Sequence, residues 1–184
     1  MQHVGTRKSP SIMSLLVIVI IIIVVIGYLM ISIGTGDFLW WNQNFSERPT
    51  AVVVHCYGEN ININPGSYHF GALTEAVNDS LSGEKRWDSL SLSEETYQDY
   101  QSNPTMLTIE MFYPEPIRVH SNYKFFSSVD NLIIPLDGRH SDFNTVFGQN
   151  QGVPAGGSLH VESIQTIGEY LKNQEICPYQ MSSN

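Results

Sequence analysis

The feature that most constrains this chain is an uninterrupted apolar run close to its N-terminus. Residues 11–33 contain no charged side chain and consist mainly of Ile, Val, Leu and Met. At about 1.5 Å per residue, a helix of this length extends roughly 35 Å, which is enough to cross a hydrocarbon layer of about 30 Å. A lone segment in lipid can satisfy its backbone hydrogen bonds only as a helix. The run therefore predicts a transmembrane helix over residues 11–33.

The alternative for the same run is a signal peptide that is cleaved off. Apolar regions of signal peptides are about 7–15 residues long and end in a small-x-small cleavage site. Residues 11–33 are longer than this, and the stretch that follows them, GTGDFLWWNQNF, contains no such site. We therefore expect an uncleaved signal anchor.

Basic residues set the expected orientation of this helix. Arg7 and Lys8 precede it, and the next basic residue is Arg48. Positive charge favours the cytoplasmic side of a membrane. The pattern predicts a single-pass protein of the cell membrane, with residues 1–10 as a cytoplasmic leader and the rest of the chain extracytoplasmic. Trp40 and Trp41 then lie where an aromatic belt is expected at the membrane interface; the alternative is that they open the core of the domain.

The extracytoplasmic part is strongly acidic. All 18 Asp and Glu lie beyond residue 34, together with the seven basic residues that follow the helix, for a formal net charge of −11. This charge argues against nucleic acid as a partner, because nucleic-acid binding requires a basic surface. It also argues against a domain that lies flat on anionic lipid. A basic protein partner or divalent cations are compatible with the charge, and its commonest role is solubility.

The chain contains two cysteines, Cys56 and Cys177, and both fall on the expected outer side. A pair of cysteines in an oxidising compartment indicates a disulfide. The alternative is that Cys56 is a buried free thiol.

Beyond the helix, residues 34–50 form a connector, and residues 51–184 form one extracytoplasmic domain. Alternating or β-branched segments predict strands. Apolar stripes after Ser67 and Ser163 predict two helices, and Ser93 followed by two acidic residues predicts a third, short one. This order of elements predicts an α+β fold with a mainly antiparallel sheet covered by helices on one face. The strands are expected at 50–58, 104–113, 117–120, 131–136, 144–149 and 158–162, with turns or loops at 59–67 and 84–92.

The segment PLDGRHSDF at 135–143 combines ionisable side chains with turn chemistry. Asp137-Gly138 between two apolar runs favours a hairpin turn. We expect Pro135 at the edge or end of a strand, because proline cannot donate a hydrogen bond to the sheet. Phe143 is expected to return to the core.

Four residues are candidates for a metal site. They form two pairs in which one residue separates a histidine from an acid: His140 with Asp142, and His160 with Glu162. Imidazole and carboxylate groups are common metal ligands. If the strand that carries His160 and Glu162 lies beside those that carry Glu110, Arg118 and His120, these five side chains share one polar face. The alternative is charge pairing on a solvated face. The chain lacks a zincin, EF-hand or Cys/His metal-binding spacing.

These features predict a membrane-anchored interaction or accessory domain, a subunit of a membrane or envelope complex. We expect contact with the bilayer through 11–33, at least one protein partner, no cofactor and no catalytic activity. The alternative is an extracytoplasmic enzyme or metal-binding domain that uses the His/Asp/Glu cluster.

Overall fold

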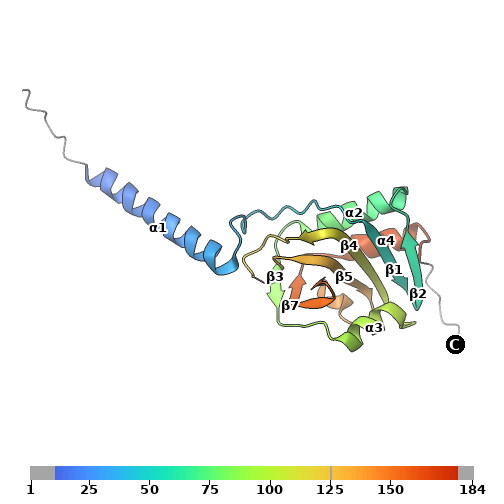
Figure 1. Ribbon diagram of the computed structural model, residues 1–184. Coiled ribbons are helices and arrows are strands. Elements are labelled where there is room, and N and C mark those ends of the chain that lie inside the picture. Colours follow the sequence, from blue (N-terminus) through green and yellow to red (C-terminus); the bar gives the residue numbers. More distant parts are fainter. Residues whose placement is uncertain (1–10, 125, 178–184) are drawn as a thin grey trace, which may run out of the picture.

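The computed structural model describes residues 11–124 and 126–177. The expected leader at 1–10, with Arg7 and Lys8, lies outside the described residues. Within them, helix α1 (Ile12–Thr35) extends away from an α+β domain (Figure 1). The remaining helices are α2 (Tyr68–Leu81), α3 (Glu94–Ser102) and α4 (Gln165–Asn173), and the strands are β1 (Ala51–Cys56), β2 (Glu59–Ile63), β3 (Arg86–Asp88), β4 (Leu107–Ile117), β5 (Val129–Asp137), β6 (Thr145–Asn150) and β7 (Val153–His160).

The strands form one sheet in the order β2-β1-β4-β5-β6-β7-β3. Every pairing among these strands is antiparallel. The predicted α+β class with an antiparallel sheet is therefore confirmed, and the described chain contains four α-helices including α1.

One face of the sheet packs against α2 and α4 and carries the larger core. Alternating residues of β4 and β5 point to this face, among them Ile109, Met111 and Leu132, which are fully buried. Leu73, Val77 and Leu81 supply the apolar stripe of α2, and the Ser67 hydroxyl accepts a hydrogen bond from the Phe70 backbone, as an N-cap does.

The opposite face is also covered, so the expectation of helices on one face only is wrong. Helix α3 and the segment before it place Tyr100 and Leu92 against Ile133 and Phe147, which project from β5 and β6. α3 is short and mostly polar, and this small cluster holds it against the sheet. Figure 1 shows α3 on the side of the sheet opposite α2 and α4.

Residues 59–67, expected to be a turn, instead begin with strand β2. β1 and β2 form a hairpin whose turn is Tyr57-Gly58, with φ angles of 50° and 94°. Two consecutive positive φ angles match the twist of a two-residue hairpin. Asn-Pro-Gly at 64–66 then follows β2 and precedes α2.

The predicted hairpin between 131–136 and 144–149 is confirmed as β5 and β6, but two details differ. Pro135 lies inside β5 and is buried. It is opposite Thr108 of β4, beside the register shift at Leu107/Thr108, and it lies beyond Ile133, the last residue of β5 that pairs with β6. Both features suit a residue that cannot donate a hydrogen bond to the sheet. Phe143 belongs to the 3-10 turn η1 (Ser141–Phe143) and is exposed, so its expected return to the core is wrong.

The segments 104–113 and 117–120 were expected to be two strands. Instead, one strand, β4, runs through Pro114 and Pro116, with a register shift between Phe112 and Ile117. Residues 86–88, expected in a loop, form the short edge strand β3, which pairs with β7. The last helix begins at Gln165 with Ile164 as its N-cap residue, one position later than predicted.

Cys56 and Cys177 form the predicted disulfide, with Cα atoms 5.7 Å apart. Both are buried in the larger core, so the bridge holds the segment after α4 against the end of β1.

Candidate functional site

The site that stands out lies where α1 meets the domain. α1 ends at Thr35, and its C-cap residue Gly36 has a left-handed backbone with a φ of 69°. The Arg118 guanidinium donates a hydrogen bond to the Gly36 carbonyl oxygen over 3.1 Å, and His120 Nδ1 lies 2.9 Å from Asp37 Oδ2. We call these two interactions the junction contacts. They join the end of α1 to the segment after β4, and a cation at a helix C-terminus is electrostatically favourable.

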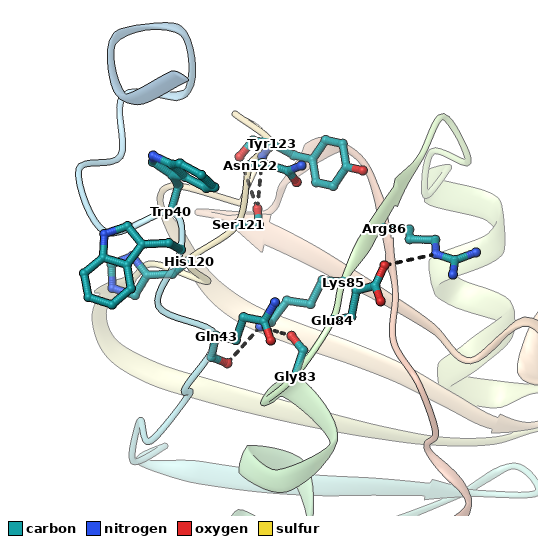
Figure 2. Close-up of a pocket in the computed structure, with 11 residues that line it drawn as sticks. Trp40, Gln43, Gly83, Glu84, Lys85, Arg86, His120, Ser121, Asn122 and Tyr123 are labelled. Carbon is teal, nitrogen blue, oxygen red and sulfur yellow. Dashed lines mark hydrogen bonds and ion pairs between the residues drawn. The ribbon is translucent and has the colours of Figure 1, made fainter. Parts of the chain in front are cut away.

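Beside these contacts lies a cavity of about 350 Å³, which we call the junction pocket. Its lining residues come from three segments far apart in sequence: Trp40, Trp41 and Gln43 after α1, residues 83–86 from the end of α2 to the start of β3, and residues 120–123 after β4. Figure 2 shows residues of all three segments around the pocket. The connector is tied to the end of α2, because the Gly83 backbone donates to the Gln43 carbonyl and Ser82 Oγ accepts from the Phe45 backbone.

Lys85 is the unusual residue of this pocket. It is only 8% exposed, and its ammonium donates to the backbone carbonyl oxygens of Gln43 and Gly83, each at 3.0 Å. Burial lowers the pKa of Lys85 to about 8. Among the residues that the structure describes, Lys85 forms no ion pair.

The other charges of the pocket are paired. Arg86 Nε lies 3.7 Å from Glu84 Oε1, and both side chains are largely exposed; Figure 2 shows Arg86 directed away from Lys85. The Trp40 indole Nε1 is buried and has no hydrogen-bond partner within the described part of the chain. Ser121 Oγ donates to the Tyr123 carbonyl in a local turn.

The Asp37–His120 pair is chemically versatile. A carboxylate that holds one nitrogen of an imidazole can orient the ring as a general base. Here Asp37 also accepts a hydrogen bond from the Leu39 backbone. The pair joins α1 to the domain, and a positioning role explains its geometry.

A second buried polar cluster lies beneath α3. His55 Nε2 is 3.3 Å from Glu110 Oε2, and His55 Nδ1 is 2.6 Å from Asn60 Oδ1. Burial by itself would lower the pKa of His55, but the contacts with Glu110 and Asn60 and the charge of Glu110 together raise it. Burial, followed by the charge of Glu110, raises the pKa of Tyr97 on α3.

The predicted metal residues are dispersed. The His140 ring packs on Phe147 at 5.8 Å between ring centroids and shares a hydrogen bond with the Tyr100 hydroxyl; burial, followed by the charge of Arg139, lowers its pKa. Asp142 is exposed in η1. His160 and Glu162 line a separate pocket with Glu84 and Arg86. The described residues contain no group of three or more His, Cys, Asp or Glu able to hold a metal ion.

The expected polar face that joins Glu110, Arg118 and His120 with His160 is wrong. Two strands separate β4 from β7, and β4 ends before Arg118. Glu110 is buried under α3, whereas Arg118 and His120 contact the end of α1. Trp40 is half-buried at the junction pocket and Trp41 is exposed, and neither belongs to the domain core.

A larger groove, of about 880 Å³, lies between the connector and α2. Its charged side chains are exposed, so water solvates their charges; they are Arg48, Glu75 and Asp79. The junction pocket is smaller but contains a buried charge, which makes it the stronger candidate.

Sequence reasoning missed Lys85 and Asp37. Lys85 was placed in a loop, and the only signal was a cation just after the end of a helix. Nothing in the chain indicates that it lies near Gln43. The comparisons with known proteins give no match to a family model, a curated protein or a solved structure.

Proposed function

We propose that this chain is a single-pass membrane protein whose extracytoplasmic domain is held in a fixed position at the membrane surface and binds other proteins as an accessory subunit of a membrane or envelope complex. In this proposal α1 spans the bilayer with its N-terminus in the cytoplasm. The domain and the junction pocket then lie on the outer side, immediately above the membrane.

The properties of α1 support the anchoring. The most apolar 18-residue stretch of Ile12–Thr35 has a mean hydropathy of 3.3, and 6% of this stretch is buried against the rest of the chain. Large Ile, Val and Leu side chains along the helix are therefore exposed, which is unfavourable in water and favourable in lipid. Arg7 and Lys8, outside the described residues, support the orientation through their sequence position.

The observation that carries the accessory role is the pair of junction contacts. A flexible tether would leave the domain free to rotate above the membrane. Instead, Arg118 and His120 contact Gly36 and Asp37, directly after the helix, and the Tyr28 hydroxyl donates to the Phe38 carbonyl over 2.7 Å. A fixed domain presents the same surfaces at the same height to neighbouring membrane proteins, and stable assembly with such proteins depends on this geometry.

Affinity purification of the full-length chain tests the accessory role. The chain is solubilised in several mild detergents and its mass is measured by native electrophoresis. A matched control retains residues 1–41 and lacks the domain. We expect a complex larger than the monomer, with proteins that co-purify with the full chain and not with the control. Migration as a lone monomer in every detergent would contradict the accessory role.

A further inference from the structure

We propose that the junction pocket binds the phosphate group of a membrane phospholipid, with the Lys85 ammonium as the cationic ligand. The lipid as the source of this phosphate rests on the proposed membrane anchoring. Phosphate binding at Lys85 rests on the pocket itself.

Lys85 is a buried cation that lacks an anionic partner. An ammonium group has three N–H donors, and the carbonyl oxygens of Gln43 and Gly83 accept two of them. Neutral carbonyls do not neutralise the charge, and no carboxylate of the described residues pairs with it. Buried charges in proteins are ordinarily paired. A phosphate oxygen in the adjacent cavity would supply both the missing acceptor and the missing charge.

The charged side chains that line the pocket leave one charge without a partner. Glu84 and Arg86 pair with each other, and His120 contacts Asp37, which lies outside the lining. Lys85 remains as the uncompensated charge among the ionisable side chains that line the pocket. One positive charge balances one phosphodiester, the group that links the headgroup of a phospholipid to its glycerol. Lysine binds phosphate as a point charge and does not require a fixed bidentate geometry. Such a contact suits a phospholipid whose headgroup can vary.

Trp40 gives a second, independent indication. Its indole N–H is buried and has no acceptor in the described chain, and a buried donor without a partner carries a desolvation cost. Trp40 and Lys85 line the same pocket. In the sequence, Trp40 precedes strand β1 and Lys85 follows it. A phosphate oxygen that reached the indole N–H would supply its missing acceptor.

The position of the pocket favours a lipid as the source of the phosphate. Trp40 follows the end of α1 within a few residues, and the junction contacts hold residues 118–120 against the same end. Lys85 and Arg86 line the pocket, and Arg118 contacts the end of α1, in a domain whose formal charge is −11. The acidic surface disfavours flat binding to anionic lipid, whereas a single pocket at the helix end does not require such contact. Burial keeps the pKa of Lys85 at about 8, so the ammonium is mostly protonated at neutral pH.

The test is native mass spectrometry of the full-length chain in uncharged detergent micelles, titrated with phosphatidylglycerol. Diacylglycerol, which lacks the phosphate, is the lipid control. We expect one phosphatidylglycerol to bind more tightly than any further copy. Lys85→Met should weaken this first binding at least about tenfold, because it removes a hydrogen bond to a charged group. Lys172→Met, on the exposed surface of α4, is the matched control and should change nothing.

Trp40→Phe provides a second variant that keeps an aromatic ring and removes the N–H. We expect it to weaken binding about fivefold, which keeps the proposal testable even where Lys85→Met impairs folding. Unchanged binding in both folded variants would overturn the proposal, and so would equal binding of diacylglycerol.

Inorganic phosphate distinguishes the two possible sources of the anion. If it occupied the pocket as tightly as the lipid, with the same dependence on Lys85, the ligand would come from solution and the lipid assignment would be wrong. Failure of the membrane anchoring would appear differently, as release of the chain from membranes by carbonate without detergent. Such release would leave binding of inorganic phosphate to Lys85 intact.

Discussion

His55 and Glu110 form an ion pair beneath helix α3, with side chains only 5% and 2% exposed and 3.3 Å between Nε2 and Oε2. They lie on neighbouring strands: Val53 is opposite Glu110, and His55 is opposite Thr108, so the two side chains meet on a diagonal. A short helix with few apolar residues therefore covers a charged pair, and Tyr97 of this helix lies close enough for Glu110 to raise its pKa.

This pair should make the stability of the domain depend on pH. The folded state raises the pKa of His55 above its ordinary value of 6.5. The stabilisation is therefore fully present below about pH 6.5 and is lost as the pH rises through the folded pKa. We expect urea unfolding of the full chain in uncharged detergent to show a higher free energy of unfolding at pH 6 than at pH 8.5.

Glu110→Gln should remove most of this pH dependence and destabilise the domain by about 1–3 kcal/mol at pH 6, because it leaves His55 buried without its charge partner. Glu115→Gln, on an exposed position of the same strand, is the control. An unchanged pH profile in Glu110→Gln would show that His55 is not coupled to Glu110.

The disulfide should contribute strongly to stability. Cys56 and Cys177 are separated by 121 positions in the sequence, and closure of a loop of this length restricts the unfolded chain by about 4–5 kcal/mol. We expect the double variant Cys56→Ala/Cys177→Ala to unfold at a lower urea concentration, with a loss of about 2–5 kcal/mol. A reductant should then lower the stability of the wild-type chain and leave the double variant unchanged. A reductant effect of equal size in both proteins would exclude the bridge as the cause.

Two glycines with positive φ allow the cost of backbone strain to be measured apart from the cost of steric overlap. Gly157 has a φ of 124°, and a Cβ there would lie 2.5 Å from the Asp88 carbonyl oxygen, at the contact between β3 and β7; Gly152 has a φ of 77° and open space around it. We expect Gly152→Ala to cost about 1 kcal/mol from strain alone, and Gly157→Ala about 3 kcal/mol or more. Thermal unfolding of both variants measures the difference. Equal losses would mean that β3 moves aside at little cost.

Lipid binding at the junction pocket should weaken in alkaline solution. The pKa of Lys85 is lowered to about 8, so the ammonium loses its proton above this pH and no longer attracts phosphate. We expect the affinity for phosphatidylglycerol to be constant below about pH 7 and to fall by up to about tenfold per pH unit above 8. Lys85→Met should bind weakly at every pH. A wild-type affinity that is flat from pH 6 to 10 would exclude Lys85 as the titrating ligand.

The sequence predicted those parts of the fold that depend on local patterns. Ser67 and Ser93 cap α2 and α3 as expected, and the alternating segment 104–113 forms most of strand β4. The hairpin of β5 and β6 followed from Asp137-Gly138, although η1 lengthened its turn. These features depend on neighbours in the chain, which is why the sequence alone reveals them.

The errors arose where distant segments meet. Glu110 was expected on a polar face, and only tertiary packing places α3 over it. Glu59–Ile63 is rich in Asn, which disfavours strands, but pairing with β1 outweighs this preference. The junction pocket joins segments about 40 residues apart in sequence, and no local pattern connects Trp40 with Lys85 or Asp37 with His120.

The topology of the chain in intact cells decides whether α1 spans the membrane in the proposed orientation. Both native cysteines are in the disulfide, so an added cysteine provides a single thiol for a membrane-impermeant maleimide. Ser89→Cys places this thiol at an exposed position of the domain, and Ser9→Cys places it before α1. The account predicts that intact cells, stripped of any outer envelope, label Ser89→Cys at once and Ser9→Cys only after the membrane is permeabilised. Labelling of Ser9→Cys alone in intact cells would contradict it.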